Sequence, residues 1–387
     1  MKALMNGTYL VGETEVSQGA LIFNNRIIGL LEADQIPEGC EVIDATGLFV
    51  SPGLIDLHIH GYLGEDASDG SKKGIRAIAK GLLKNGVTSF LPTTMTVSWP
   101  ELEAAFNVIR TLRDESCHLS FDGARILGAH AEGPFINPKR KGAQAADAIL
   151  PPDAARILRH QDIVRILTMA PEMPGGLEMI REITRQSSIV VSIGHTDADY
   201  TVATEAIQAG ASYITHLFNA MSGLHHRDPG VVGAALTQPV FTELIADTFH
   251  VHAGLLGFLH DVKRDKLILV TDCTRAGGLT DGEYSLGGQP IYVKGIECRL
   301  ADGTIAGSVL KLNEAVRNLR DYAGLTTAQA VYTASRNAAT AIGVENDKGT
   351  LDAGKDADIV LFDQQLNTMA VYIGGELKYR QGSQTKR

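Results

Sequence analysis

Short apolar runs alternate with longer segments of helical periodicity from residue 51 onward. This alternation is typical of a parallel α/β sheet. Eight of the runs are predicted strands: Leu54–His60, Val87–Pro92, Ile126–Ala131, Val164–Met169, Ile189–Gly194, Tyr213–Leu217, Phe241–Ala246 and Leu267–Asp272. The predicted helices between them include Lys72–Asn85, Glu101–Arg113, Gly176–Gln186, Asp199–Ala209 and Ala253–Val262. Eight β/α steps favour a closed barrel, and an open doubly wound sheet is the alternative.

Both ends of the chain have a different pattern, in which β-rich runs follow one another with turn residues between them. The predicted strands here are Tyr9–Val11, Gly19–Phe23, Arg26–Leu30, Ala357–Phe362 and Met369–Ile373. We therefore expect one small β module built from residues 1–51 and 353–387, with the barrel spanning 52–352. Residues 273–305 have the pattern of an insertion of short strands, and two helices are predicted after it, Leu310–Asp321 and Thr327–Ile342.

Composition narrows the class of protein. The 387 residues include 35 Lys and Arg against 45 Asp and Glu, and the formal net charge is −10. An acidic balance argues against nucleic acid or an anionic membrane as the main partner, although a small anionic ligand needs only one or two cations. The N-terminus reaches polar residues too soon for a signal peptide, and no apolar stretch has the length of a membrane helix. Four scattered cysteines suggest reduced thiols and a cytoplasmic protein.

Metal-binding residue types recur at the carboxyl ends of five predicted strands. They are His58 and His60, Glu132, His195, His216 and Asp272. A single histidine at a strand end is more often an ordinary polar residue, but carboxyl strand ends of a barrel converge on one mouth. The His-x-His spacing also places both imidazoles on one face of a strand. The pattern therefore predicts a site for a divalent metal such as zinc, with water completing the shell.

The two ends of the barrel region carry motifs of a known superfamily. Asp44–Gly61 resembles the opening signature of the amidohydrolase superfamily, and Lys348–Val360 resembles its closing signature. Within that superfamily, further segments resemble the N-acetylglucosamine-6-phosphate deacetylase family: 130–138, 141–143, 169–172, 194–196, 215–221 and 306–308. The resemblance implies a metal-bearing (β/α)8 TIM-type barrel with a small β-sandwich domain formed by both termini. It also implies hydrolysis of the acetyl amide of a phosphorylated amino sugar.

The resemblance also implies roles for individual residues. Glu132, His195 and His216 match the metal ligands of the family, and Asp272 matches its catalytic acid/base. The substrate-binding positions implied are Ala143, Gln144, Asn219, Ala220, Arg227, His250, Ala306, Gly307 and Ser308. Zinc is the expected metal, with iron or another divalent ion as alternatives and one or two ions per subunit. A cytoplasmic homodimer with phosphate contacts near the subunit boundary is expected.

Two positions vary within the family. His58 and His60 are both present here, so a second metal is possible in this chain. Gln144 occupies a position that is histidine in some members, where it polarises the substrate carbonyl; glutamine can donate a hydrogen bond but cannot become cationic. The alternatives are a deacetylase for N-acetylgalactosamine 6-phosphate, a cyclic amidase and a catalytically silent barrel. The cyclic amidase is disfavoured because no bridging lysine lies near Arg165–Met169.

Overall fold

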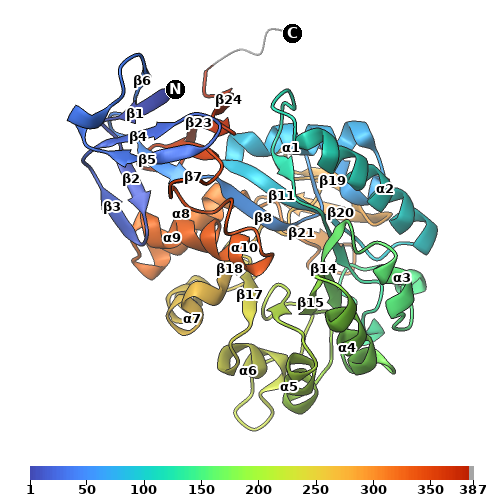
Figure 1. The fold of residues 1–387 in the computed structure, drawn as a ribbon. Helices are drawn as coiled ribbons and strands as arrows, with labels where there is room; N and C mark the ends of the chain where they lie inside the picture. Colours follow the sequence, from blue (N-terminus) through green and yellow to red (C-terminus); the bar gives the residue numbers. More distant parts are fainter. Residues whose placement is uncertain (383–387) are drawn as a thin grey trace.

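The computed structural model describes residues 1–382 and contains a barrel of parallel strands (Figure 1). The barrel strands are β8 (Leu54–Ile59), β11 (Val87–Thr94), β12 (Arg125–Ile126), β13 (Ala129–Glu132), β14 (Val164–Met169), β15 (Val190–Ile193), β16 (Tyr213–Ile214), β17 (Phe241–Leu244) and β18 (Leu267–Leu269). β8 pairs with β11, and the order then runs through β13 to β18. The ring closes where Ile59 bridges Cys273 and the Asp272 N–H donates to the His58 carbonyl at 2.8 Å. The predicted (β/α)8 barrel is confirmed.

Helices surround the strands in the predicted alternation. They are α1 (Lys72–Leu82), α2 (Trp99–Ser116), α3 (Ala154–Leu158), α4 (Gly176–Gln186), α5 (Tyr200–Gln208), α6 (Gly230–Thr237), α7 (Leu256–Lys263), α8 (Leu312–Ala323), α9 (Thr327–Thr333) and α10 (Arg336–Ala341). α1 illustrates the cause: the Ser71 side chain caps it by accepting from the Gly74 N–H, and Ile75, Ile78 and Leu82 form its buried face.

Three features of the helical layer differ from the sequence prediction. The single helix predicted over Thr327–Ile342 is two helices, because Ser335 leaves helical geometry at φ −133° and ψ −81°. The short helix α3 and the helix α6 were not predicted. α6 contains Gly230 and Gly233 and is buried along most of its length, so its sequence lacks both a high helix propensity and an amphipathic pattern.

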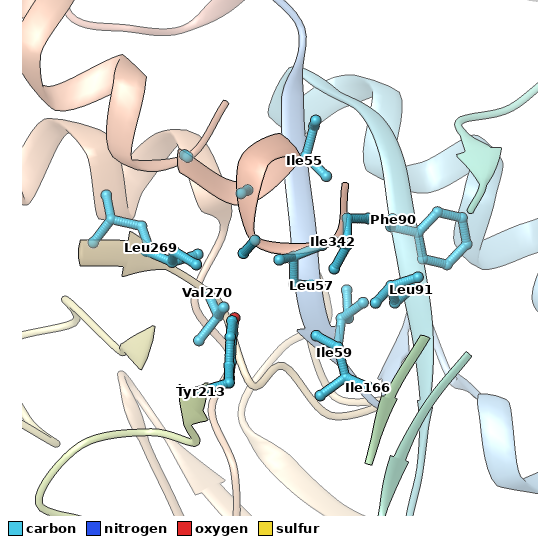
Figure 2. Close-up of a cluster of buried hydrophobic side chains, with 14 of the residues drawn as sticks. Ile55, Leu57, Ile59, Phe90, Leu91, Ile166, Tyr213, Leu269, Val270 and Ile342 are labelled. Carbon is cyan, nitrogen blue, oxygen red and sulfur yellow. The ribbon is translucent and has the colours of Figure 1, made fainter. Parts of the chain in front are cut away.

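Alternation along β8 separates the apolar core from the polar interior of the barrel. Ile55, Leu57 and Ile59 belong to the main hydrophobic core, which Figure 2 shows together with Phe90 and Leu91 of β11. The residues between them, Asp56 and His58, point to the opposite face, because successive side chains of a strand alternate. This alternation places the histidines of the His-x-His motif inside the barrel.

Strands from both chain ends share one sheet. The strands outside the barrel are β1 (Lys2–Met5), β2 (Thr8–Val11), β3 (Thr14–Val16), β4 (Ala20–Phe23), β5 (Ile27–Leu31), β6 (Glu41–Asp44), β7 (Phe49–Pro52), β22 (Ile359–Phe362), β23 (Thr368–Ile373) and β24 (Glu376–Arg380). One sheet has the order β5-β4-β1-β6 and the other β24-β23-β22-β7-β2-β3, so β22 lies beside β7. Tyr9, Phe23, Ile359 and Tyr372 share a core. The boundaries given for this module from the sequence stay a prediction, and residues 383–387 lie outside the described chain.

The insertion after the last barrel strand forms a separate antiparallel sheet. Its strands are β19 (Gly282–Leu286), β20 (Gln289–Lys294) and β21 (Glu297–Leu300), and a small hairpin of β9 (Gly61–Tyr62) and β10 (Glu65–Asp66) follows β8. Leu286 and Ile291 pack with Met95 and Ala143, which belong to connections at the mouth of the barrel. Within residues 1–382, helices long and apolar enough to cross a bilayer are absent.

Candidate active site

Three side chains from different strand ends meet around one carboxylate oxygen. Glu132 ends β13, and His195 and His216 follow β15 and β16. The Glu132 Oε1 atom lies 3.1 Å from His195 Nε2 and 3.0 Å from His216 Nε2, and the two imidazole nitrogens are 3.2 Å apart. All three residues are buried. The structure therefore brings together the three residues whose sequence context suggested metal ligation.

His58, His60 and Asp272 form a second group next to the first. The Asp272 Oδ1 atom lies 3.1 Å from His60 Nε2 and 3.5 Å from His58 Nε2. Glu132 links the groups, since its Oε1 is 3.3 Å from His58 Nε2 and its Oε2 is 3.3 Å from His60 Nε2. The His195 ring is oriented by its Nδ1, which lies 2.9 Å from the Arg140 carbonyl, and its Nε2 therefore points toward Glu132.

The clustered charges shift the proton affinities of these groups strongly. Burial alone would lower the pKa of His60, but the carboxylates of Asp272 and Glu132 raise it to about 10. The pKa of Asp272 falls to about 2, because the attraction of His58 and His60 outweighs the cost of burial. The pKa of Glu132 is likewise held well below its ordinary value by His58 and His195. The imidazoles and carboxylates thus stabilise each other's charged forms.

The donor set fits a divalent cation. Within each of the two groups the ligand atoms lie within 4.8 Å of one another, and all belong to buried residues. Imidazole nitrogen together with carboxylate oxygen is a typical ligand set for zinc in catalytic sites, where a position remains for water. These residues can therefore hold a divalent metal, as the strand-end pattern predicted.

A cavity of about 380 Å³ opens above the metal-binding groups. Six of the predicted substrate-binding residues line it: Ala143, Gln144, Asn219, Ala220, His250 and Gly307. His250 is oriented by Asp247, whose Oδ2 lies 2.6 Å from His250 Nδ1. His60, Glu132, His195, His216 and Asp272 contribute to the floor and walls. The cavity thus places a bound molecule against both groups.

Three predicted substrate-binding residues lie elsewhere. Arg227 is exposed and lines a separate hollow beside α5 and α6, together with Asp228. Ala306 and Ser308 are fully buried, and the Ser308 hydroxyl donates to the Thr271 carbonyl at 2.5 Å. Ser308 therefore fixes the segment that carries Asp272, while its neighbour Gly307 faces the cavity.

Gln144 is anchored at both ends of its amide. Its Nε2 donates to Glu132 Oε2, and its Oε1 accepts from the Thr96 N–H at 2.6 Å. The Gln144 side chain is 2% exposed. Glutamine has two N–H donors, so one of them holds Glu132 in place and one stays available for a ligand in the cavity.

The structure adds functional candidates that sequence reasoning missed. Lys139 and Arg140 line the cavity at the 3₁₀ helix Pro138–Arg140 and supply cations in an acidic protein. Glu243 lies fully buried on β17 and contacts His58. A charged residue inside the apolar strand Phe241–Ala246 was the available signal for Glu243. Lys139 and Arg140 lie between two segments already noted, 130–138 and 141–143, but side-chain direction in a loop is not readable from sequence.

Comparison with known proteins agrees with this geometry. Residues 49–378 match the Amidohydrolase family, and the chain belongs to this family. The N-acetylglucosamine-6-phosphate deacetylase of Bacillus subtilis (strain 168) is 39% identical over 97% of this chain and 97% of its own length. The N-acetylgalactosamine-6-phosphate deacetylase of Escherichia coli O157:H7 is 35% identical over 88% of this chain and 90% of its own.

A solved structure shows the same fold over nearly the whole chain. The crystal structure of N-acetylglucosamine-6-phosphate deacetylase from Pasteurella multocida superposes with a TM-score of 0.91 at 30% sequence identity. The match covers 97% of this chain and 99% of that one. The resemblance seen in the sequence motifs is thereby confirmed at the level of family and fold.

Proposed function

We propose that this protein hydrolyses the acetyl amide of N-acetyl-D-glucosamine 6-phosphate, giving D-glucosamine 6-phosphate and acetate. The observation that carries the proposal is the meeting of Glu132, His195 and His216 at one point, with Asp272 beside them on the wall of a cavity. The similarity to deacetylases along nearly the full chain supports the substrate class.

The residues answer the two difficulties of amide hydrolysis, a weak nucleophile and a poor leaving group. A divalent cation held by Glu132, His195 and His216 supplies Lewis acidity, which acidifies water and polarises a carbonyl. Asp272 takes a proton from the attacking water at its carboxylate and delivers it to the departing nitrogen.

Oxyanion stabilisation requires donors at the point where negative charge develops. Gln144 lines the cavity, and one N–H of its amide holds Glu132 while the other is left for a ligand. His60 also lines the cavity, but its Nδ1 contacts the Thr93 carbonyl and its Nε2 contacts Asp272. Donors fixed in advance by other contacts cost little reorganisation during the reaction. Gln144 meets that condition, because Thr96 and Glu132 hold its amide in one orientation.

The phosphate end of the substrate needs cations. The cations Lys139 and Arg140 line the cavity, and Arg140 is also paired with Asp197 at 2.8 Å. Arg227 lies outside this cavity in the single chain. A phosphate role for Arg227 therefore requires movement of its loop or a second subunit, and we propose a homodimer with Arg227 near the boundary. Arginine suits this role because its guanidinium matches phosphate oxygens in pairs.

The proposed function also includes the identity of the metal ion and the cellular compartment of the protein. Zinc is the proposed ion, because the ligands are nitrogen and carboxylate oxygen, and His58, His60 and Asp272 offer a place for a second one. The four cysteines are free thiols, which agrees with a reducing compartment, and we propose a cytoplasmic protein.

Kinetics on two epimers test the proposed substrate. Acetate release is measured with N-acetylglucosamine 6-phosphate and N-acetylgalactosamine 6-phosphate, and metal content is determined on the same sample. The proposal predicts a higher kcat/KM for the gluco epimer. A higher kcat/KM for the galacto epimer would make N-acetylgalactosamine 6-phosphate the preferred substrate instead. Metal-replete protein that releases acetate from neither sugar phosphate would refute the proposed activity.

A further inference from the structure

One buried carboxylate contacts a member of each of the two groups of candidate metal ligands. Glu243 is fully buried on β17 and contacts Nδ1 of His58, whereas Asp272 faces Nε2 of the same ring. Its Oε2 atom lies 2.9 Å from His58 Nδ1 and accepts the main-chain N–H of His216 at 2.9 Å. A residue that ligates no metal in the arrangement above therefore holds one member of each group.

The contact with Glu243 determines which nitrogen of His58 carries a proton. An ionised carboxylate only accepts hydrogen bonds, so a 2.9 Å contact requires the proton on Nδ1. Nε2 is then the nitrogen that can give up its proton and offer a lone pair to a metal, and it faces Glu132 Oε1 and Asp272 Oδ1. A histidine without this partner could present a protonated Nε2 instead, and that nitrogen cannot bind a metal.

The contact with His216 fixes the main chain rather than the ring. His216 has φ 27°, a conformation that costs free energy for any residue other than glycine. The hydrogen bond from its N–H to Glu243 helps to hold this backbone geometry, which turns the imidazole toward Glu132.

Glu243 also belongs to a third cluster of metal-binding residue types, with His58 and His130. The side-chain nitrogens of His130 are both engaged, with the Leu57 carbonyl at 3.0 Å and with Thr168 Oγ1 at 2.7 Å. His58 Nδ1 is engaged with Glu243 itself. The His130 ring packs edge to face on His58 with centroids 4.6 Å apart. These contacts make the third cluster a support for His58 rather than a further metal site.

We propose that Glu243 is a positioning residue that sets the tautomer of His58 and the backbone of His216, so that metal binding at the two groups depends on one carboxylate. The proposal rests on the metal dependence in the proposed function. Carboxylate partners of histidine ligands fix the ring and raise its basicity, and their loss lowers metal affinity by about 10- to 100-fold.

The test is zinc binding by the variant Glu243→Gln. Glutamine keeps the size of the side chain but removes the charge and adds an N–H donor. Metal-depleted full-length protein competes with a chromophoric chelator for zinc, and we expect affinity lower by about 10- to 100-fold.

Asp56→Asn is the matched control. Asp56 is equally buried on β8 and contacts Thr271 and the main-chain N–H of His58, but no imidazole nitrogen. We expect its zinc affinity to stay within about threefold of the wild type, because the carboxylate partner of the His58 ring is untouched in this variant.

A spectroscopic measurement keeps the proposal testable if Glu243→Gln fails to fold. Nitrogen-15 histidine spectra of the zinc-loaded wild type report the tautomer of each imidazole, and the variant His58→Asn identifies the signal of His58. The expected result is a proton on Nδ1 of His58. A proton on Nε2, or a folded Glu243→Gln protein with wild-type zinc affinity, would overturn the proposal. Neither readout requires turnover, so a failure of the proposed substrate would be seen separately.

Discussion

His195, His216 and Asp272 share a main-chain feature that explains how they reach the site. Their φ values are 48°, 27° and 50°, all in the left-handed region. Each residue lies just beyond the end of a barrel strand, and the change of backbone direction turns its side chain into the mouth. Such geometry costs about 1–3 kcal/mol per residue and persists where surrounding contacts over-determine it. The Asp272 N–H, for example, donates to the His58 carbonyl.

Asp272→Asn tests the proposed acid/base residue. Asparagine keeps the size and the ligand oxygen but cannot accept a proton from water. We expect kcat to fall by about 10²- to 10⁴-fold, the usual contribution of a general acid/base. Metal analysis should show near-normal content at the Glu132 group, and retention of most of the activity would remove Asp272 from this role.

Arg227→Ala tests the proposed phosphate contact. A charged hydrogen bond contributes about 1.5–3 kcal/mol, so we expect KM for the phosphorylated sugar to rise by about 10- to 100-fold. The control substrate is unphosphorylated N-acetylglucosamine, whose slower hydrolysis should change little. Equal losses on both substrates would contradict a role in phosphate binding.

At the scale of elements, the connections after the strands determine the shape of the site. Glu172 ties two of them together, since its carboxylate accepts from Asn137 at 2.8 Å and from Thr196 at 2.5 Å. The first connection carries Lys139 and Arg140, and the second follows His195 directly. A third segment, at Gly307, packs against the residues that follow the last barrel strand and include Asp272.

Gly307→Ala tests that packing against a matched control. Gly307 has φ +56°, and an added Cβ would lie 2.9 Å from the Asp272 carbonyl oxygen and 2.7 Å from Thr274 Cγ2. Gly303 has φ +88°, but a Cβ there would meet no atom within 4 Å. Both substitutions should destabilise the fold by about 1–2 kcal/mol through backbone conformation.

Only Gly307→Ala should also displace Asp272. A misplacement of about 1 Å at a catalytic group can lower the rate about 100-fold. Steady-state kinetics and urea unfolding on both variants measure the two effects separately. Similar kcat values for Gly307→Ala and Gly303→Ala would show that Asp272 tolerates the added methyl group.

The sequence allowed prediction wherever a local pattern decides the structure. Val164–Met169 and Gly176–Gln186 were predicted with the bounds that the structure has, because a buried strand and an amphipathic helix each carry their own periodicity. The strand predicted over Tyr213–Leu217 ends at Ile214, since the residues that follow turn into the mouth. The break at Ser335 depends on tertiary packing, which no local pattern encodes.

The candidate site divides in the same way. Parallel strands end at one edge, so Glu132, His195 and His216 could be placed together from sequence. The hydrogen bond from His58 to Glu243 spans 185 residues and follows only from the closed barrel. The direction of Arg227 likewise depends on a loop conformation, and for that reason its place outside the cavity was not predictable.

At the scale of the whole molecule, an ionic cluster joins the terminal strands to the barrel. Lys348 Nζ lies 2.6 Å from Asp358 and 2.9 Å from Asp356, and Asp356 also pairs with Arg125 of β12 and with Arg26. Lys348 and Asp358 are 7% and 6% exposed. Burial opposes the charge on Asp358, but Lys348 and Arg125 hold the pKa of this carboxyl below its ordinary 3.8.

Lys348→Met should destabilise the protein strongly, because Asp358 would stay buried beside fewer positive charges. Removing one partner of a buried pair costs about 3–5 kcal/mol. Lys80→Met is the control, since the pair of Lys80 with Asp122 is exposed and should contribute less than about 1 kcal/mol. Urea unfolding at neutral pH measures both changes, and a loss for Lys348→Met no larger than for Lys80→Met would contradict the role of the cluster.

The same pair predicts a pH dependence. A carboxyl whose pKa is lower in the folded state stabilises the protein above the ordinary value of 3.8, and this contribution is lost as the pH falls through the folded pKa. The difference in unfolding free energy between the wild type and Lys348→Met should therefore shrink below about pH 4. A difference that stays constant down to about pH 2 would exclude Asp358 as its source.

Removal and return of the metal test the central claim most directly. Exhaustive chelation of the wild-type protein should reduce acetate release from N-acetylglucosamine 6-phosphate to background, and stoichiometric zinc should restore it. Protein with His195→Asn and His216→Asn should stay inactive under the same zinc addition while remaining folded by circular dichroism. Undiminished acetate release after chelation, verified by metal analysis, would contradict the account.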